Sequence, residues 1–214
     1  MPLLANRLSS FTQIVKTFFM FNISYLDVSG SMGLIASGAL TLNIIVGILL
    51  STGFKKTSYW KKLPYQLQQY PLIQFHQLTA YAGLLFTALH ILFLIAYKEE
   101  NFTFYHLLKP LKAPKQANIV LFGAIGFYGL ILTIITSQKI IKRKLSFRTW
   151  KNIHLIAYVT GLFFLLHGLL MDPLLKDRPT DWLDAEKFFS EACLGIVLIA
   201  ILLRIRYQFK STNN

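Results

Sequence analysis

Five long apolar runs with few or no charged residues constrain this chain more than any other feature of its sequence. A run of roughly twenty apolar residues is long enough to cross the hydrocarbon core of a bilayer as a helix. The charged fraction of 14% is well below that of a soluble domain, where about a quarter of the residues are charged. We therefore predict an all-α fold, a polytopic membrane helix bundle with five clear spans. The spans are predicted at about 32–53, 72–97, 118–138, 151–171 and 188–206.

The N-terminal segment is expected to lie along the membrane surface. In residues 8–26, apolar side chains recur at helical spacing, while Gln13, Lys16 and Thr17 fall on the other side. This pattern favours an amphipathic helix in the interface, with a sixth span as the alternative. We expect no cleavable signal peptide, because the first twenty residues lack a basic region followed by a clean apolar core. We thus divide the chain into an N-terminal amphipathic segment, 1–30, and a transmembrane domain, 31–214.

The chain is strongly basic, with a formal net charge of +13. No recognition motif accompanies this charge, so we expect no nucleic-acid partner, and basic cytoplasmic loops explain the charge instead. One side of the predicted bundle holds thirteen of the twenty-two Lys and Arg, in 54–71, 138–151 and the tail after 203, whereas all nine Asp and Glu fall on the other side. We expect an integral protein of the plasma membrane, the inner one in a bacterium, with its basic loops in the cytoplasm.

Two of the predicted spans share an arrangement of histidines. His76 and His90 lie fourteen residues apart in the second span, and His154 and His167 lie thirteen apart in the fourth. These spacings correspond to roughly 21 and 20 Å along a helix. One span separates the two segments, so they run parallel and offer two imidazoles at each of two depths. Ionisable groups inside a bilayer are costly and usually functional.

The chemistry of these side chains favours the axial ligation of haem iron. The single Cys193 excludes an internal disulfide and a cysteine-ligated zinc site, and the sequence has no Cys-x-x-Cys-His motif for covalent haem attachment. Two neutral imidazoles without a nearby carboxylate or thiolate suit haem iron better than zinc or non-haem iron. Gly83 and Gly161, between the histidines of each segment, would give a porphyrin room. Ordinary close packing of helices explains these glycines equally well.

The thirteen-residue spacing does not fit a straight helix that faces one partner. At about 100° per residue, fourteen positions return to within roughly 40° of the same face, but thirteen leave an offset of about 140°. We therefore expect a local tightening or bend in the fourth span, near Gly161, that aims both His154 and His167 at one partner.

Two stretches of the chain resemble a known family. The run SFRTWKNIHLIAYVTGLFFLLHGLL, together with FHQLTAYAGLLFTALH, is similar to the ferric reductase-like transmembrane domain. That family includes the membrane part of NADPH oxidases, fungal ferric reductases and the haem subunit of the bacterial methionine sulfoxide reductase system. The resemblance runs from about Met32 to Tyr207, and its specific parts are the two spaced histidine pairs and the basic-aromatic lead-in RTWKNIH.

The resemblance implies that 31–214 is a haem-binding domain with two b-type haems and that it carries electrons across the membrane. It implies that His76 pairs with His154 at the inner haem and His90 with His167 at the outer haem, and that the thirteen-residue spacing is tolerated. The ferric reductases and oxidases of the family continue into flavin and nucleotide domains, whereas this sequence contains no Gly-x-Gly-x-x-Gly fingerprint. We therefore expect a separate electron donor, a flavoprotein, a quinol or bound flavin, and an acceptor at the outer face.

Several residues near the histidines have a possible supporting role. Arg148 and Lys151 lie shortly before His154. They are candidates to pair with haem propionates, or else serve as positive-inside anchors. Trp150 is an interface-anchor candidate. Aromatic residues lie between the two depths, where they would fill the space that electrons cross or pack against lipid and core. They are Phe86, Phe163 and Phe164.

Two other functions remain open from the sequence. A proton-handling transporter or channel would use the histidines as a relay, and it would require a polar path through spans that offer few polar partners. A structural assembly subunit would simply pack its histidines against neighbouring helices.

Overall fold

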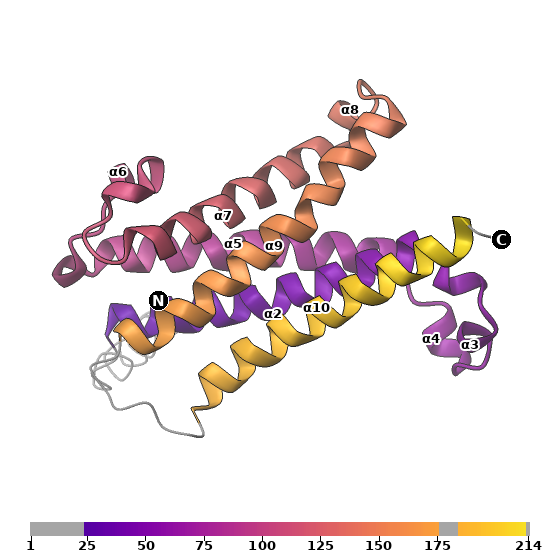
Figure 1. The fold of residues 1–214 in the computed structure, drawn as a ribbon, viewed down its shortest axis with the longest axis horizontal. Coiled ribbons are helices and arrows are strands. Elements are labelled where there is room, and N and C mark those ends of the chain that lie inside the picture. Colours follow the sequence, from indigo (N-terminus) through magenta and orange to yellow (C-terminus); the bar gives the residue numbers. More distant parts are fainter. Residues whose placement is uncertain (1–23, 176–183, 213–214) are drawn as a thin grey trace, which may run out of the picture.

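The computed structural model describes residues 24–175 and 184–212, and these residues form helices joined by short connections, without any strand (Figure 1). The long helices are α2 Tyr25–Ser51, α5 Leu72–Ala96, α7 Ala117–Ser137, α9 Phe147–Leu175 and α10 Ala185–Thr212. The short ones are η1 Phe54–Lys56, α3 Ser58–Lys61, α4 Tyr65–Gln68, η2 Lys98–Glu100, α6 Phe104–Leu108, η3 Pro110–Lys112 and α8 Lys139–Lys142.

Five of the described helices are long and apolar enough to cross a membrane, which confirms the predicted all-α bundle with five spans. The first of them begins at Tyr25 rather than Met32, because the Ser24 side chain accepts a hydrogen bond from the Leu26 amide and Asp27 lies in the first turn. Both features stabilise a helix N-terminus. The proposed amphipathic helix falls mostly on residues outside the described ranges, and the division of the chain at residue 30 stays a prediction.

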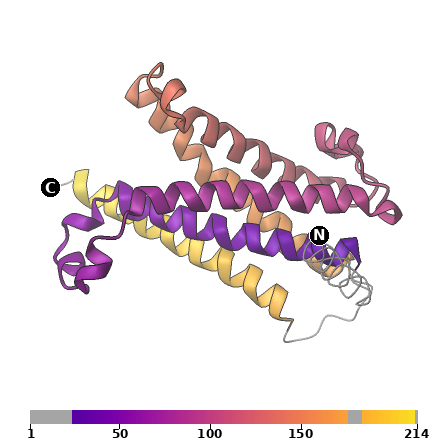
Figure 2. The ribbon, with the colours of Figure 1, turned by 180° about the vertical axis from the view of Figure 1, so that it is seen from behind.

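The long helices form two antiparallel hairpins and a fifth helix. Helix α2 packs along α5, and α7 packs along α9. The α7–α9 hairpin is inclined to the α2–α5 hairpin, so α9 passes across α2 and α5 (Figures 1 and 2). Helix α10 packs against both α2 and α9. Helices α2 and α9 therefore lie at the centre of the bundle, each in contact with three other long helices.

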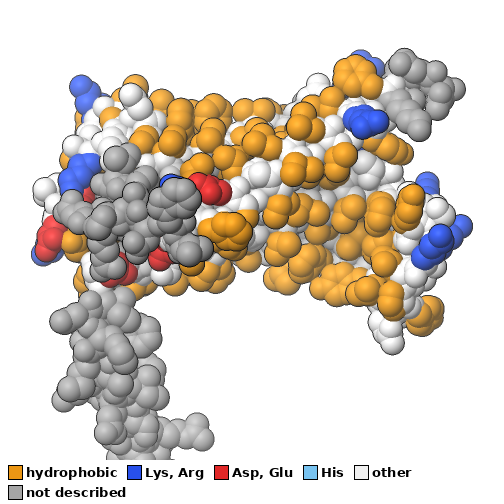
Figure 3. Space-filling model, turned by 60° about the horizontal axis from the view of Figure 1, so that its bottom comes forward, with side chains coloured by type: hydrophobic (Ala, Val, Ile, Leu, Met, Phe, Trp, Pro, Cys, Tyr) orange, Lys and Arg blue, Asp and Glu red, His pale blue; other side chains and the backbone are white. Residues whose placement is uncertain are grey.

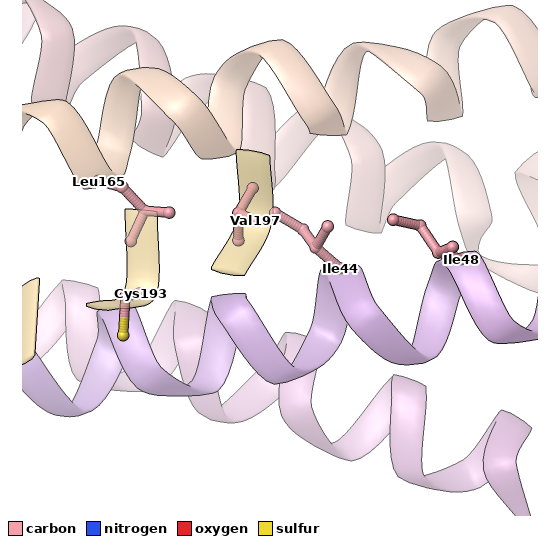
Figure 4. Packing of buried hydrophobic residues seen from close by; sticks show 5 residues of the cluster. All are labelled: Ile44, Ile48, Leu165, Cys193 and Val197. Atoms are coloured by element: carbon pink, nitrogen blue, oxygen red, sulfur yellow. The ribbon is translucent and has the colours of Figure 1, made fainter. Parts of the chain in front are cut away.

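Two apolar clusters join the hairpins. The first lies where α2, α9 and α10 meet, and its side chains interdigitate from the three helices (Figure 4). It contains Ile44, Ile48, Leu165, Cys193 and Val197. The second joins α2 to α9, with side chains of α5 and α7 packed against it. It contains Ala36, Leu40 and Phe164, flanked by Phe86 and Leu130.

The surface between the two ends of the bundle is mostly apolar, as expected for contact with lipid (Figure 3). We call the end that carries α3, α4 and α8 the basic end. The end that carries α6 and the start of α10 is the acidic end, since carboxylates such as Asp27, Glu99, Glu100 and Glu186 lie there. Tyr59 and Tyr65 are exposed at the basic end, as expected of headgroup residues. Trp60 differs, because it is buried against Val46 of α2 and Leu72 of α5.

Candidate functional site

The structure brings the four histidines of the spans together in two pairs, each formed between α5 and α9. The ring centroids of His76 and His154 are 6.0 Å apart, and those of His90 and His167 are 6.3 Å apart. We call the first the basic-end pair and the second the acidic-end pair, after the ends of the bundle to which they are nearer. The rings of each pair lie at steep angles to each other, 67° and 77°.

Hydrogen bonds to Ser29 of helix α2 support the His90 ring of α5. The Nδ1 atom of His90 lies 2.8 Å from the Ser29 carbonyl oxygen, and because a carbonyl can only accept, Nδ1 carries the proton. The Ser29 hydroxyl donates in turn to the His90 carbonyl at 2.8 Å. One turn later, Gly33 lies beside the ring, where an added Cβ would be 3.2 Å from Nδ1. The missing side chain thus lets the imidazole lie against the helix backbone.

The same helix repeats this arrangement for His76, fourteen residues further along. His76 Nδ1 donates to the Asn43 carbonyl at 3.1 Å, and the Asn43 side-chain amide donates to the His76 carbonyl and to the Thr79 hydroxyl. Gly47, again four residues after the acceptor, has the His76 ring 3.1 Å from the position of an added Cβ. Helix α2 therefore carries two equivalent supports for the two imidazoles of α5.

Helix α7 supports one imidazole of α9 in the same manner. His167 Nδ1 donates to the Ile119 carbonyl at 2.9 Å. Gly123, four residues after Ile119, is in the tightest contact of the three, because an added Cβ would lie 2.9 to 3.0 Å from three atoms of the His167 ring. A carbonyl acceptor followed one turn later by a glycine is thus common to three of the four histidines.

His154 is held differently. Its Nδ1 lies 3.3 Å from the Ser137 hydroxyl of α7, an oxygen that can either donate or accept. The indole of Trp150, one turn earlier in α9, stacks on the His154 ring at 5.1 Å and 24°. The Lys142 ammonium lies over the Trp150 ring, 3.8 Å from its centroid.

The tightening or bend expected near Gly161 stays a prediction, but helix α9 does reach both partners. It is one uninterrupted helix from Phe147 to Leu175, and yet His154 and His167 each meet a histidine of α5. The inclination of α9 supplies the physical reason (Figure 1). A helix that crosses a neighbour at an angle presents different sides to that neighbour at its two ends, so an offset of about 140° suits the two positions.

Gly83 and Gly161 are buried and face side chains of α2. An added Cβ would lie 2.9 Å from Leu40 at Gly83 and 2.6 Å from Ile44 at Gly161. Apolar side chains of the central helix already fill the space beside these two glycines. The geometry therefore favours close helix packing over room for a porphyrin as the reason for them.

The other candidate residues occupy three different environments. Arg148 and Lys151 lie in the first turns of α9, and both are exposed at the basic end. Phe164 is buried and Phe86 packs in the same cluster, between the depths of the two histidine pairs. Phe163 packs instead on the Phe122 ring of α7, 5.3 Å away between centroids.

The arrangement fits iron held axially by imidazoles. A metal–nitrogen bond of about 2 Å on each side, together with the radii of two imidazole rings, separates the ring centres by roughly 6 to 6.5 Å. Both observed separations lie in or next to this range. Metal-binding histidines usually donate their second nitrogen to a carbonyl, which leaves the other nitrogen with its lone pair, and three of the four rings do so here.

The donor set also indicates what kind of cofactor would complete the coordination. No group of three or more His, Cys, Asp or Glu is placed to hold a metal ion among the residues that the structure describes. Two imidazoles therefore match a metal whose remaining ligands come from a macrocycle, as in haem. The indole Nε1 of Trp150 is buried with no partner among these residues.

Sequence reasoning missed the supports behind the histidines. Ser29, Asn43 and Ile119 act through backbone carbonyls, which any residue provides, so their residue types do not reveal them. The glycines did leave a pattern, because Gly33 and Gly47 are separated by the same fourteen residues as His76 and His90. In an antiparallel hairpin such matched spacing indicates contact between these glycines and the two histidines.

Comparisons with known proteins give one match. Residues 32–166, more than half of the chain, match the family model described as the ferric reductase like transmembrane component. No curated protein and no solved structure matches the chain significantly. The matched region contains α5, α7 and His154, and it ends one residue before His167.

Proposed function

Because the chain belongs to the family of ferric reductase-like transmembrane components, we propose that it carries electrons singly across a membrane through two b-type haems. The observation that carries this proposal is the meeting of two histidine pairs at the separation that an axially ligated iron requires. When bound, haem iron supplies a reversible one-electron couple. The residues of the chain bind, orient and separate the two centres.

His76 and His154 would hold the haem nearer the basic end, and His90 and His167 the haem nearer the acidic end. The carbonyls of Ser29, Asn43 and Ile119 keep three of these rings protonated at Nδ1 and ready to bind iron through Nε2. Such bonds also raise the basicity of the ligand, which stabilises the oxidised metal.

The space between the pairs is built from apolar side chains. Along α5 the two histidines are fourteen residues apart, which corresponds to roughly 21 Å along the axis. Leu40, Phe86 and Phe164 pack at the intervening depth and exclude water there. A dry, close-packed region of this kind needs little solvent rearrangement when charge moves through it, so it suits electron transfer better than proton transfer.

Arg148 and Lys151 are placed for the propionates of the haem at the basic end, because both lie within two turns of His154 on α9. We place the basic end in the cytoplasm of a bacterial cell, following the excess of Lys and Arg in its connections. The donor, a flavoprotein or quinol, would then act at the basic end, and the acceptor at the opposite face.

Spectroscopy of purified protein tests the haems. Expression with ample haem supply is expected to give a red protein with the reduced-minus-oxidised spectrum of bis-histidine haem b. A pyridine haemochrome assay should find about two haems per chain. Folded, monodisperse protein without haem after such expression would overturn the proposal.

Cysteine labelling tests the sidedness separately. In a Cys193→Ser background, Tyr59→Cys places a thiol at the basic end and Tyr105→Cys one at the acidic end, at positions that are 72% and 51% exposed. A membrane-impermeant maleimide applied to intact cells stripped of any outer membrane is expected to label Cys at 105 and not at 59. The reverse pattern would invert the assignment of donor and acceptor faces.

A further inference from the structure

His154 lacks the support that fixes the other three imidazoles. The neighbouring helix gives each of them a carbonyl acceptor and, four residues later, a glycine against the ring. Among the described residues, the hydrogen-bond partner of His154 Nδ1 is the Ser137 hydroxyl, at 3.3 Å, and a hydroxyl turns freely and serves equally as donor or acceptor. Neither the plane of the His154 ring nor the nitrogen that carries its proton is fixed by α7.

The contact that does restrict this ring comes from its own helix. Trp150 lies four residues before His154, a spacing that brings side chains together on one face of a helix. The two rings are close to parallel, at 24°, with centroids 5.1 Å apart, and this is the offset-stacked arrangement that aromatic pairs prefer. Lys142 of α8 lies 3.8 Å from the Trp150 centroid, and a cation at that distance from an indole is attracted to it.

Trp150 does not have the environment of a membrane-interface anchor. Such a tryptophan directs its indole N–H towards headgroups and water. The Nε1 atom of Trp150 is instead buried, and it has no hydrogen-bond partner among the described residues. The indole is thus partly buried, with its N–H turned away from solvent and with both the Lys142 ammonium and the His154 ring against it.

We propose that Trp150 is the positioning residue of His154, and that its stacked indole sets the plane of the imidazole at the basic-end pair. The indole replaces the carbonyl and glycine support of the other three histidines, and Lys142 keeps it in place. This inference rests on the haem ligation proposed above. It assigns the basic-end centre a determinant that the acidic-end centre does not have.

The test uses the full chain, purified with its haems, and two substitutions at one position. Trp150→Leu removes the stack, whereas Trp150→Phe keeps an aromatic ring on His154 and removes the N–H. Low-spin electron paramagnetic resonance reports the orientation of imidazole planes, and transfer of haem to apomyoglobin reports haem retention. Trp150→Leu should shift one of the two low-spin signals and speed the loss of one haem about two- to tenfold, while Trp150→Phe should resemble the wild type.

Controls separate this role from general destabilisation. Tyr59→Leu removes an exposed aromatic side chain from the same end of the bundle and should leave both signals unchanged. Should Trp150→Leu fail to accumulate, Trp150→Met replaces it, because methionine fills volume without a ring. Unchanged low-spin signals in Trp150→Leu, or in Trp150→Met where that variant replaces it, would overturn the inference. A Trp150→Phe variant whose signals and haem retention change as much would also overturn it. Wild-type protein without haem would instead refute the proposed function.

Discussion

The two histidine pairs are alike in ring separation and different in how their rings are held. At the acidic end both imidazoles donate to backbone carbonyls, His90 to α2 and His167 to α7. At the basic end only His76 does so, and His154 depends on a hydroxyl and a stacked indole. One end is therefore fixed by helix packing, and the other by a local side-chain stack.

This difference teaches that the geometry of the acidic-end pair depends on the bundle, while that of the basic-end pair can vary with a few side chains. A backbone carbonyl stays in place when its residue is substituted, so Ser29 and Ile119 can change residue type without loss of these hydrogen bonds, provided that the glycines beside the rings are kept. A stacked side chain can be removed by one substitution. We expect the basic-end centre to be the more adjustable of the two.

The largest effects should come from the ligands themselves. His167→Leu is expected to remove the acidic-end haem and leave the other, and His154→Leu to do the reverse, because each iron would lose one of its two protein ligands. Haem content per chain and the low-spin signals measure both. His106→Leu is the matched control, since this histidine lies in α6 outside the spans and bonds to Thr103. Loss of both haems from either single substitution would show that the pairs are not independent.

The second effect should come from the glycines beside the rings. Gly123→Ala places a Cβ 2.9 to 3.0 Å from the His167 ring, so the ring must leave its hydrogen bond to Ile119 or α7 must move. We expect haem retention at the acidic end to fall about ten- to a hundredfold, as for other changes that disturb the orientation of a metal-ligating histidine. Haem transfer to apomyoglobin measures the loss.

Alanine substitutions at the other two glycines beside the rings should lower haem retention by smaller amounts. Gly33→Ala and Gly47→Ala should each act less strongly, because their nearest ring atoms are 3.2 and 3.1 Å away and the neighbour must give by only a few tenths of an ångström. Gly30→Ala on the same helix is the control, since nothing lies within 4 Å of its added Cβ. Equal losses at Gly30 and Gly123 would contradict the role assigned to the contacts.

The helices and the histidines were predictable from the sequence because their signals are local. Apolar runs fix the spans, and the spacing of rare histidines marks the site. The start of α2 at Tyr25 was missed because it depends on the Ser24 cap, and the start of α9 at Phe147 because basic residues continue the helix beyond the apolar run. The stack of Trp150 on His154 could have been predicted, because the two residues are four positions apart on one helix. From the sequence alone we considered Trp150 only as an interface anchor.

Features that depend on two helices at once were not predictable in the same way. The support of His167 by Ile119 requires the register of α7 against α9, and a backbone carbonyl has no signature in the sequence. The inclination of α9, which makes a thirteen-residue spacing acceptable, arises from packing against α2, α7 and α10. Helix arithmetic on one span leaves out this inclination, which reduces the bend that the thirteen-residue spacing requires.

A smaller effect is expected where a side chain joins α2 to α5. Asn43→Leu removes the amide donors to the His76 carbonyl and the Thr79 hydroxyl, but leaves the carbonyl that holds the His76 ring. Interhelical hydrogen bonds of this kind contribute about 0.5 to 2 kcal/mol. We expect a loss of that size in unfolding free energy, measured in detergent by denaturant titration, with both haems kept. Ser31→Ala is the control, because that hydroxyl bonds only within α2. Loss of the basic-end haem would mean that the amide itself positions His76.

The smallest effect should come from Ser137→Ala. Its hydroxyl is the sole hydrogen-bond partner of His154 Nδ1 that the structure describes. If all four supports were equivalent, the basic-end haem would be lost when this hydroxyl is removed. We expect the opposite, because a bond at 3.3 Å to a freely turning hydroxyl is weak and Trp150 already restricts the ring. Haem retention should change by no more than about twofold, which corresponds to a hydrogen bond at the low end of the usual range. The decisive measurement compares Ser137→Ala with Trp150→Leu in one titration of the basic-end signal. If the serine variant loses haem faster than the tryptophan variant, the hydroxyl is the true support of His154, and the two ends of the bundle are held in the same way after all.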